Sequence, residues 1–80
     1  MRQYNERNQL ETVICNQCKK QLKVENGILK EGHFEGKQTF GYFSRKDGMT
    51  HKFDLCEACY DKMIVQFEIP VEEIEEKEIL

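Results

Sequence analysis

Two Cys-x-x-Cys pairs constrain the fold of this chain more than any other feature of its sequence. They occupy residues 15–18 and 56–59 and contain all four cysteines. Each pair brings two sulfur atoms close enough to bind one ion, and two pairs together complete the closed four-cysteine shell of structural zinc sites. We therefore expect one structural Zn²⁺, with four ligands: Cys15, Cys18, Cys56 and Cys59.

The size of the chain also favours a metal. Eighty residues form at most one domain, and a domain this small rarely builds a core that is stable without a metal or a disulfide. Only 39% of the residues are hydrophobic, 34% are charged, and there is no tryptophan. We expect a thin core, with the bound metal supplying the stability that the core lacks.

Disulfide bonds are the main alternative use of the cysteines. The first nine residues contain no apolar stretch typical of a secretory signal, and no segment has the ~20 apolar residues of a membrane span. We expect a cytoplasmic protein, whose thiols stay reduced and whose paired cysteines bind metal or perform redox chemistry. A thioredoxin-like redox pair would lie near a βαβ pattern, which the sequence does not show. Iron remains an alternative metal, because a four-cysteine shell also suits a rubredoxin-type centre.

Catalysis at the metal is not expected. A catalytic zinc keeps an open or water-filled position, whereas four thiolates close the shell. His33 and His51 are alternative ligands, but the four cysteines already suffice. The chain has no glycine-rich phosphate-binding motif, and it has no Ser/His/Asp or Cys/His arrangement with a spare cysteine. We therefore expect that the protein is not an enzyme.

The first cysteine pair is expected on a tight turn, or knuckle, followed by a β-hairpin. Residues 12–14 form a short β-prone run before it, and residues 19–25 alternate apolar and charged side chains as a half-buried strand does. Asn26-Gly27 then gives the strongest short hairpin signal, because both residues tolerate positive φ. Residues 28–30 would form the returning strand.

A second hairpin is expected between the first hairpin and the second cysteine pair. Residues 37–44 are aromatic and β-prone, residues 46–48 (KDG) suit a turn, and residues 49–53 would return. Gly41 stands between aromatic residues, where it would mark a bulge or a close approach of the backbone.

The clearest periodic pattern predicts a helix that begins near the second cysteine pair. Asp54 is a good N-cap residue, and Glu57 three positions later would complete a capping box. Pro70 would end the helix. Apolar residues recur at the spacing of one helical face, and they are Cys56, Cys59, Tyr60, Met63, Ile64 and Phe67. The two cysteines would lie in the first turn, where backbone N–H groups and the helix dipole favour thiolates.

These patterns divide the chain into three segments. We expect a flexible N-terminal arm at residues 1–10, a zinc-binding domain at residues 11–70 and an acidic C-terminal tail at residues 71–80. The chain has a net charge of −3, but residues 63–80 carry one lysine against six glutamates. The whole molecule is therefore not an electrostatic nucleic-acid binder. The tail could dock on a partner or on a second copy, or it could remain solvated.

The order of knuckle, hairpins and helix, with metal ligands at both ends, resembles the treble-clef zinc finger. A zinc ribbon is the competing form, in which both pairs lie on turns between strands. Asn16 and Lys19 depart from the common ribbon knuckle, where Pro and Gly are frequent at these positions. The expected fold class is therefore α+β, a small zinc-stapled treble-clef-like domain with two β-hairpins and one C-terminal helix.

Two further stretches carry a second resemblance, residues 41–48 (GYFSRKDG) and 51–61 (HKFDLCEACYD). With the first knuckle, they resemble small uncharacterised zinc-finger-like proteins of bacteria such as the Firmicutes. The resemblance covers about residues 13–70. It implies a cytoplasmic bacterial protein and no particular activity.

Aromatic residues of the second hairpin are the candidates for function. Phe40 and Tyr42 fall on one face of the expected strand and Phe43 on the other, so one face must expose an aromatic ring or cover it. Packing of these rings in the core is the simplest interpretation. The second is a surface that binds a protein partner, formed by Phe40, Tyr42, Phe43, Arg45 and Lys46.

Nucleic-acid binding is the alternative function, in a zinc finger linked to transcription or translation. The same rings would stack on bases, and Lys37, Arg45, Lys46 and Lys52 would contact phosphates. No membrane contact is expected. The sequence thus predicts a structural four-cysteine zinc site and a macromolecular interaction, with protein binding favoured.

Overall fold

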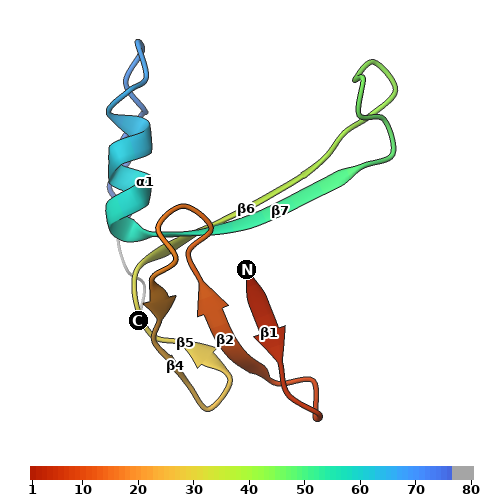
Figure 1. Ribbon diagram of the computed structural model, residues 1–80. Helices are drawn as coiled ribbons and strands as arrows, with labels where there is room; N and C mark the ends of the chain where they lie inside the picture. The colour runs from red at the N-terminus through yellow and green to blue at the C-terminus, as the bar shows by residue number, and fades with distance from the viewer. Residues whose placement is uncertain (77–80) are drawn as a thin grey trace.

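Three small antiparallel sheets and one helix make up the part of the chain that the structure, a computed structural model, describes, residues 1–76 (Figure 1). The elements in chain order are β1 (Arg2–Tyr4), β2 (Leu10–Ile14), β3 (Gln21–Leu22), β4 (Val24–Glu25), β5 (Ile28–Leu29), β6 (His33–Thr39), β7 (Thr50–Cys56) and α1 (Glu57–Ile64). This arrangement of antiparallel hairpins followed by a C-terminal helix confirms the expected α+β class. No helix within residues 1–76 has the length and apolar character needed to cross a membrane.

The first sheet has the strand order β1-β2-β3 and contains the centre of the core. Val13 of β2 lies opposite Leu22 of β3, and both side chains are fully or almost fully buried. The segment 1–10 differs from the flexible arm that the sequence suggested, because Arg2–Tyr4 pairs with β2 along its length. The sequence does not indicate this strand because its residues are mostly polar, and only one of the three side chains of β1 is even partly buried. The division of the chain at residues 10 and 70 stays a prediction.

The short hairpin β4-β5 forms as predicted. Val24 pairs with Leu29 and Glu25 with Ile28, which leaves Asn26-Gly27 as a two-residue turn. Asn26 has φ 52° and Gly27 has φ 76°. Two successive positive φ angles define the type I′ turn that matches the twist of the flanking strands.

The second hairpin, β6-β7, is longer and differently placed than expected. Its strands pair from His33↔Cys56 to Thr39↔Thr50. The turn is the ten-residue stretch 40–49, so Phe40, Tyr42 and Phe43 lie in a loop and not in a strand. β-propensity alone misplaced this strand, because pairing with β7 ends at Thr39 and leaves Tyr42 and Phe43 exposed beyond it.

The helix α1 begins at Glu57, and its capping differs from the prediction. Cys56 is the N-cap residue and makes no side-chain capping hydrogen bond. Asp54 belongs to β7 and is buried, so the predicted Asp54–Glu57 capping box is wrong. α1 ends at Ile64, six residues before Pro70, and Phe67 lies outside it. The acidic stretch 71–76 has no regular secondary structure, and residues 77–80 of the predicted tail lie outside the described residues.

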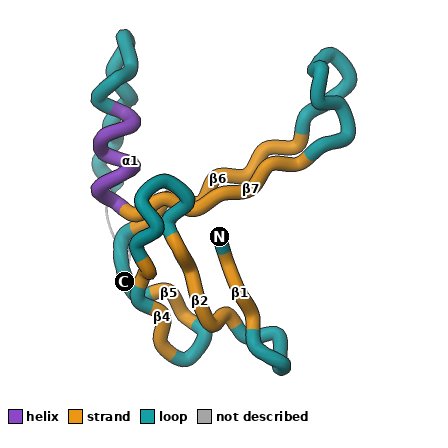
Figure 2. Tube along the Cα trace, viewed as in Figure 1, coloured by secondary structure: helices purple, strands orange, loops and turns teal. Residues whose placement is uncertain are grey.

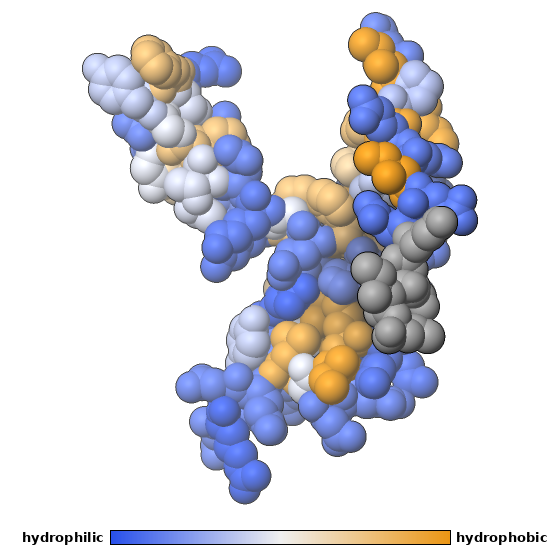
Figure 3. Space-filling model, turned by 180° about the vertical axis from the view of Figure 1, so that it is seen from behind, coloured by the Kyte–Doolittle hydropathy of each residue, from blue (hydrophilic) through white to orange (hydrophobic). Residues whose placement is uncertain are grey.

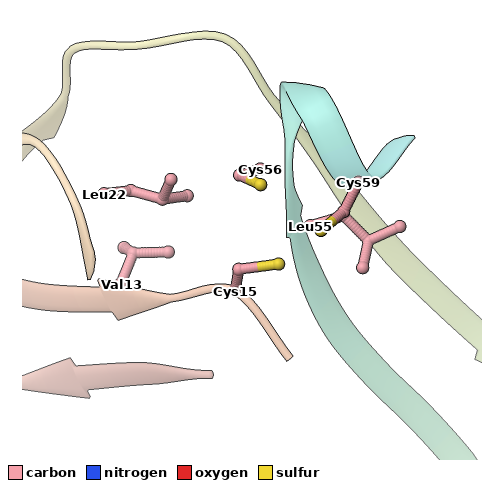
Figure 4. Packing of buried hydrophobic residues seen from close by; sticks show 6 residues of the cluster. All are labelled: Val13, Cys15, Leu22, Leu55, Cys56 and Cys59. Atoms are coloured by element: carbon pink, nitrogen blue, oxygen red, sulfur yellow. The ribbon is translucent and has the colours of Figure 1, made fainter. Parts of the chain in front are cut away.

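The core is small, and half of it is cysteine. Figure 4 shows its six buried residues: Val13, Cys15, Leu22, Leu55, Cys56 and Cys59. They come from the first sheet and its knuckle, from β7 and from the first turn of α1. A core of three aliphatic side chains and three thiols is too small to hold an 80-residue chain by apolar burial alone.

The molecule has two limbs that diverge from this core, as Figure 1 and Figure 2 show. One limb is α1 with the described residues after it (65–76), and the other is the β6-β7 hairpin with its loop, which we call the arm (residues 33–56). The chain exposes 7436 Å², whereas a compact monomer of 9.6 kDa would expose roughly 5,100 Å². The radius of gyration is 15.5 Å, against about 12 Å for a compact 80-residue domain. The fold therefore presents more surface than its own packing requires.

Candidate metal centre

The four cysteines come together at the point where the knuckle, β7 and α1 meet. Their sulfur atoms all lie within 4.8 Å of one another, and the sulfurs of Cys18 and Cys56 are 3.7 Å apart. In Figure 4 the sulfurs of Cys15, Cys56 and Cys59 converge on one point. This clustering confirms that the two pairs, 38 residues apart for Cys18 and Cys56, form a single potential metal site. The donor set fits one tetrahedral ion, because four sulfurs at these separations can surround a common centre.

The knuckle is shaped by its backbone. The N–H of Cys15 donates to the carbonyl of Lys20 at 2.9 Å, and the N–H of Lys19 donates to the carbonyl of Cys15 at 3.0 Å. Lys19 has φ 67°, a left-handed conformation that glycine adopts most easily. The position therefore has the backbone geometry of a glycine knuckle, although a lysine occupies it.

Asn16 joins the knuckle to β7. Its backbone N–H donates to the carbonyl of Asp54 at 2.7 Å, and its side-chain Oδ1 accepts the N–H of Asp54 at 2.9 Å. The two bonds hold the first cysteine pair against the strand that ends in Cys56. A proline at position 16 could make neither bond, because it has no N–H and no side-chain acceptor.

The buried carboxylate of Asp54 ties β1 to the same strand. It accepts from Arg2 Nε at 3.1 Å and from the α-amino group of Met1 at 3.0 Å. Arg2 also contacts Glu35 of β6, with Nη2 3.0 Å from a carboxylate oxygen. A buried charge needs a paired partner, and Arg2 supplies it to Asp54. The strand β1 is thus held by charge pairs beside the cysteine cluster.

The protein environment treats the cysteines unequally. Burial alone would raise the pKa of the Cys15 thiol, but the backbone N–H groups of Cys56, Cys18 and Gln17 donate hydrogen bonds to its sulfur and lower the pKa to about 6. A hydrogen bond with the sulfur of Cys56, with burial adding to it, raises the pKa of the Cys59 thiol to about 12. The site thus stabilises one thiolate and disfavours the next, because thiolates this close repel one another. A divalent cation would take the place of the remaining protons.

A lysine lies close enough to the cluster to offset part of its negative charge. Its hydrogen bond with Glu31 raises the pKa of Lys20, and Cys56 and Cys18 raise it further through their charge. The Lys20–Glu31 ion pair measures 3.0 Å, and Glu31 also accepts the backbone N–H of Lys23 at 2.7 Å. These contacts attach the loop before β6 to the knuckle.

One side of the centre is open to solvent. Cys18 is exposed, whereas Cys15, Cys56 and Cys59 are buried. A groove of about 620 Å³ runs past Cys18 and Cys59, between the knuckle and α1. Its apolar wall is formed by Phe53, Leu55 and Met63. An incoming ion, chelator or oxidant would therefore meet Cys18 first.

The structure does not bring the two histidines into the cluster. The His33 ring lies 3.3 Å from the carbonyl oxygen of Glu31, and the His51 ring packs edge-on against Phe40 at 5.1 Å. The group of metal-binding side chains found within residues 1–76 consists of the four cysteines.

The candidate partner residues gather in the loop at the end of the arm, residues 40–49, which we call the arm tip. Tyr42 is 84% exposed and Phe43 is 98% exposed, so the interpretation of these rings as core is wrong. Phe40 is half-buried, and Lys46 Nζ lies 4.5 Å from the centre of its ring. The structure therefore leaves the most exposed aromatic residues far from the metal centre.

Three residues that support the centre could not be recognised as such from the sequence, namely Arg2, Asn16 and Asp54. Asn16 had a signal, since it replaces a frequent proline, but its partner could not be named. The sequence pattern of Asp54 indicates a helix cap, because the residues that it pairs with in the structure are 38 and 52 positions away.

Comparisons of the chain with protein-family models, with curated proteins and with solved structures gave no match.

Proposed function

We propose that the protein binds one structural zinc ion and uses the resulting scaffold to present the arm to a protein partner. The cysteine cluster supports the metal, and its closed set of four thiolate donors favours zinc in a structural role over catalysis. The arrangement of a knuckle pair and a pair at the start of a helix is the one that a treble-clef finger requires. We also propose, as the sequence suggested, a non-enzymatic protein that works in the cytoplasm.

The metal identity is tested by substitution and stoichiometry. Protein purified without added metal is expected to contain about one zinc per chain, and Co²⁺ exchange should give the charge-transfer and d–d bands of a tetrahedral tetrathiolate centre. Iron with a rubredoxin-like spectrum would replace zinc in this proposal. Intact disulfides with no metal would refute it.

The observation that carries the interaction role is the exposure of Tyr42 and Phe43 at the arm tip. The two rings contact each other edge-on, with 5.3 Å between the ring centres, and neither is covered by the rest of the molecule. Aromatic and arginine side chains are enriched at protein interfaces, and Arg45 follows them closely in the chain. The surplus surface of the molecule agrees with this role.

Site-specific photo-crosslinking in the producing cell tests it directly. A photoreactive phenylalanine analogue at position 43 is expected to crosslink to a protein, and the same analogue at Ile28, an exposed apolar site on the β4-β5 hairpin, is not. If both positions crosslink to the same proteins with equal yield, a specific role for the arm tip is refuted.

Nucleic-acid binding remains the alternative, and one observation favours it. Lys37, Arg45, Lys46 and Lys52 all lie on the arm, while the exposed rings of Tyr42 and Phe43 are free to stack. This function requires single-strand binding that weakens steeply with salt. Fluorescence anisotropy with mixed oligonucleotides at low salt decides it, and an affinity no better than millimolar would eliminate it.

A further inference from the structure

The stretch that follows the helix, residues 65–76, exposes both charged and apolar side chains, and we call it the acidic segment. This acidic segment carries five glutamates and no lysine or arginine. Within residues 1–76, none of these glutamates takes part in an ion pair. Val65, Ile69 and Ile74 are 77%, 84% and 73% exposed. Three exposed aliphatic side chains among carboxylates give the segment the character of a binding surface.

The arm tip has the opposite character. It presents two exposed aromatic rings, Tyr42 and Phe43, followed directly by Ser44 and then by Arg45 and Lys46. A surface of aromatic rings edged by cations suits a ligand in which aliphatic side chains alternate with carboxylates. The acidic segment of this same chain is such a ligand, because Ile69 and Ile74 flank Glu72 and Glu73.

The arm tip is also held in a defined shape before it binds anything. Phe40 N–H donates to the Met49 carbonyl at 2.9 Å, and Gly48 N–H donates to the Phe40 carbonyl at 3.1 Å. The Ser44 hydroxyl oxygen accepts the Lys46 N–H at 3.0 Å. A loop that is already ordered loses less conformational entropy when it docks.

The outer part of the arm lacks a partner within the molecule. From Lys37 to Thr39 and from Thr50 to Lys52, every side chain is exposed on both faces of the hairpin. An isolated two-stranded hairpin is at best marginally stable in water. The arm therefore gains stability if another chain packs against it.

The two complementary surfaces lie on different limbs of the molecule. Figure 1 shows the arm and α1 diverging from the metal centre, and in Figure 3 the hollow between the limbs separates them. In this conformation the acidic segment of one molecule does not reach its own arm tip. A second copy, however, offers both surfaces at once.

We propose that two copies of this chain form a dimer in which the arm tip of each binds the acidic segment of the other. A two-fold axis makes both contacts equivalent and closes the assembly, so no binding surface is left over. The proposal rests on the interaction role proposed above and names the partner as a second copy. Charge pairs contribute to each contact, so the dimer should weaken as salt rises.

Charge reversal on each side tests the proposal. In R45E/K46E the arm tip repels the acidic segment, and in E72K/E73K the acidic segment repels the arm tip. For each variant alone, we expect a dimer dissociation constant at least about tenfold higher than that of the unchanged protein. An equimolar mixture of the two should recover the dimer, because both contacts in the mixed pair join opposite charges: one contact is the native one, and the other joins the reversed arm tip of one variant to the reversed acidic segment of the other.

The measurement is sedimentation equilibrium of the metal-loaded proteins at low and high salt. R7E/K30E is the matched control, since it removes the same charge from positions outside the arm and should dimerise like the unchanged protein. Metal content and circular dichroism verify that each variant is folded. A monomer at submillimolar concentration, or a mixture that fails to recover the dimer, overturns the proposal. A crosslink from position 43 to a different protein would overturn the dimer too, but it would leave the proposed protein-binding role in place. Oligonucleotide binding by a monomer would overturn both the dimer and the protein-binding role.

Discussion

At the scale of single residues, the metal centre depends on side chains that are not ligands. Asn16 bonds both backbone groups of Asp54, and Asp54 in turn binds Arg2. These contacts align the knuckle with the strand that carries Cys56. Such supporting contacts orient ligands, and their loss weakens metal sites even when every ligand is present.

The Asn16 side chain should therefore matter more than its neighbour. Asn16→Ala leaves the N–H of Asp54 without its acceptor, which we expect to lower the free energy of unfolding by about 1–2 kcal/mol. Gln17→Ala, in the same knuckle, should change it by less than about 0.5 kcal/mol, because that side chain is exposed and makes no such contact within residues 1–76. Denaturant unfolding of the zinc-loaded proteins measures both. Equal effects would show that the side-chain bond contributes nothing.

Acid should release the metal through the same cysteines. The amides that lower the pKa of Cys15 to about 6 stabilise its thiolate, so this contribution is present above the ordinary thiol pKa of about 8.5 and is lost as pH falls through about 6. Thiolate ligation of the ion acts in the same direction, because protons compete with it. We expect metal release on acidification, followed with a colorimetric chelator.

Cadmium provides the control for acid release. Cd²⁺ binds thiolates more tightly than Zn²⁺, so its release should occur at lower pH. If both ions leave at the same pH, protonation of a group other than the ligands causes the release.

At the scale of elements, the arm is organised by a glycine. Gly36 of β6 lies opposite Phe53 of β7, and a methyl group at position 36 would collide with the Phe53 ring. The ring crosses the strand there and packs on Phe34, which in turn contacts Tyr60 of α1 at 5.1 Å between ring centres. A row of rings thus connects the arm to the helix.

Substitution of this glycine should disturb the row. Gly36→Ala displaces the Phe53 ring, and we expect about 1–2 kcal/mol of destabilisation. Gly41→Ala is the matched control, since a methyl group there meets no atom within 4 Å. Thermal unfolding compares the two. In a Phe53→Leu background the penalty at position 36 should shrink, and a penalty that persists would place its cause elsewhere.

At the scale of the whole molecule, an ion bound by the four cysteines would supply the stability that the small core lacks. Three of the six buried hydrophobic residues are cysteines, and the knuckle, β7 and α1 meet around them. Without an ion, these segments would have to bring several thiols together with little apolar burial to offset the lost conformational entropy. Metal binding should therefore be coupled to folding.

Removal of the metal should unfold the protein. A strong chelator is expected to abolish the near-ultraviolet circular dichroism signal and the far-ultraviolet signal of the β-strands, and added zinc should restore both. Cys18→Ser, which alters the one exposed ligand, should bind zinc more weakly yet fold at excess zinc. Cys15→Ser, which alters a fully buried ligand, should fail to fold under the same conditions. A spectrum unchanged by complete metal removal would contradict this coupling.

The metal site could be predicted from the sequence because ligand chemistry is local. Each Cys-x-x-Cys pair identifies two metal-binding residues, and Asn26-Gly27 identifies a turn, because each signal depends on residues a few positions apart. The helix was also recognisable from the spacing of Cys59, Tyr60 and Met63. Local patterns therefore determined the cysteine cluster, one hairpin and the presence of α1.

Tertiary structure alone decided the rest, because it depends on contacts between residues far apart in the chain. Asp54 is a good helix cap in isolation, yet pairing with Glu35 places it in β7 and beside Arg2. The aromatic run at 40–43 has strong β-propensity, yet the strands end before it and leave Tyr42 and Phe43 in water. Burial is a property of the neighbours that folding brings close, and a sequence pattern does not specify them.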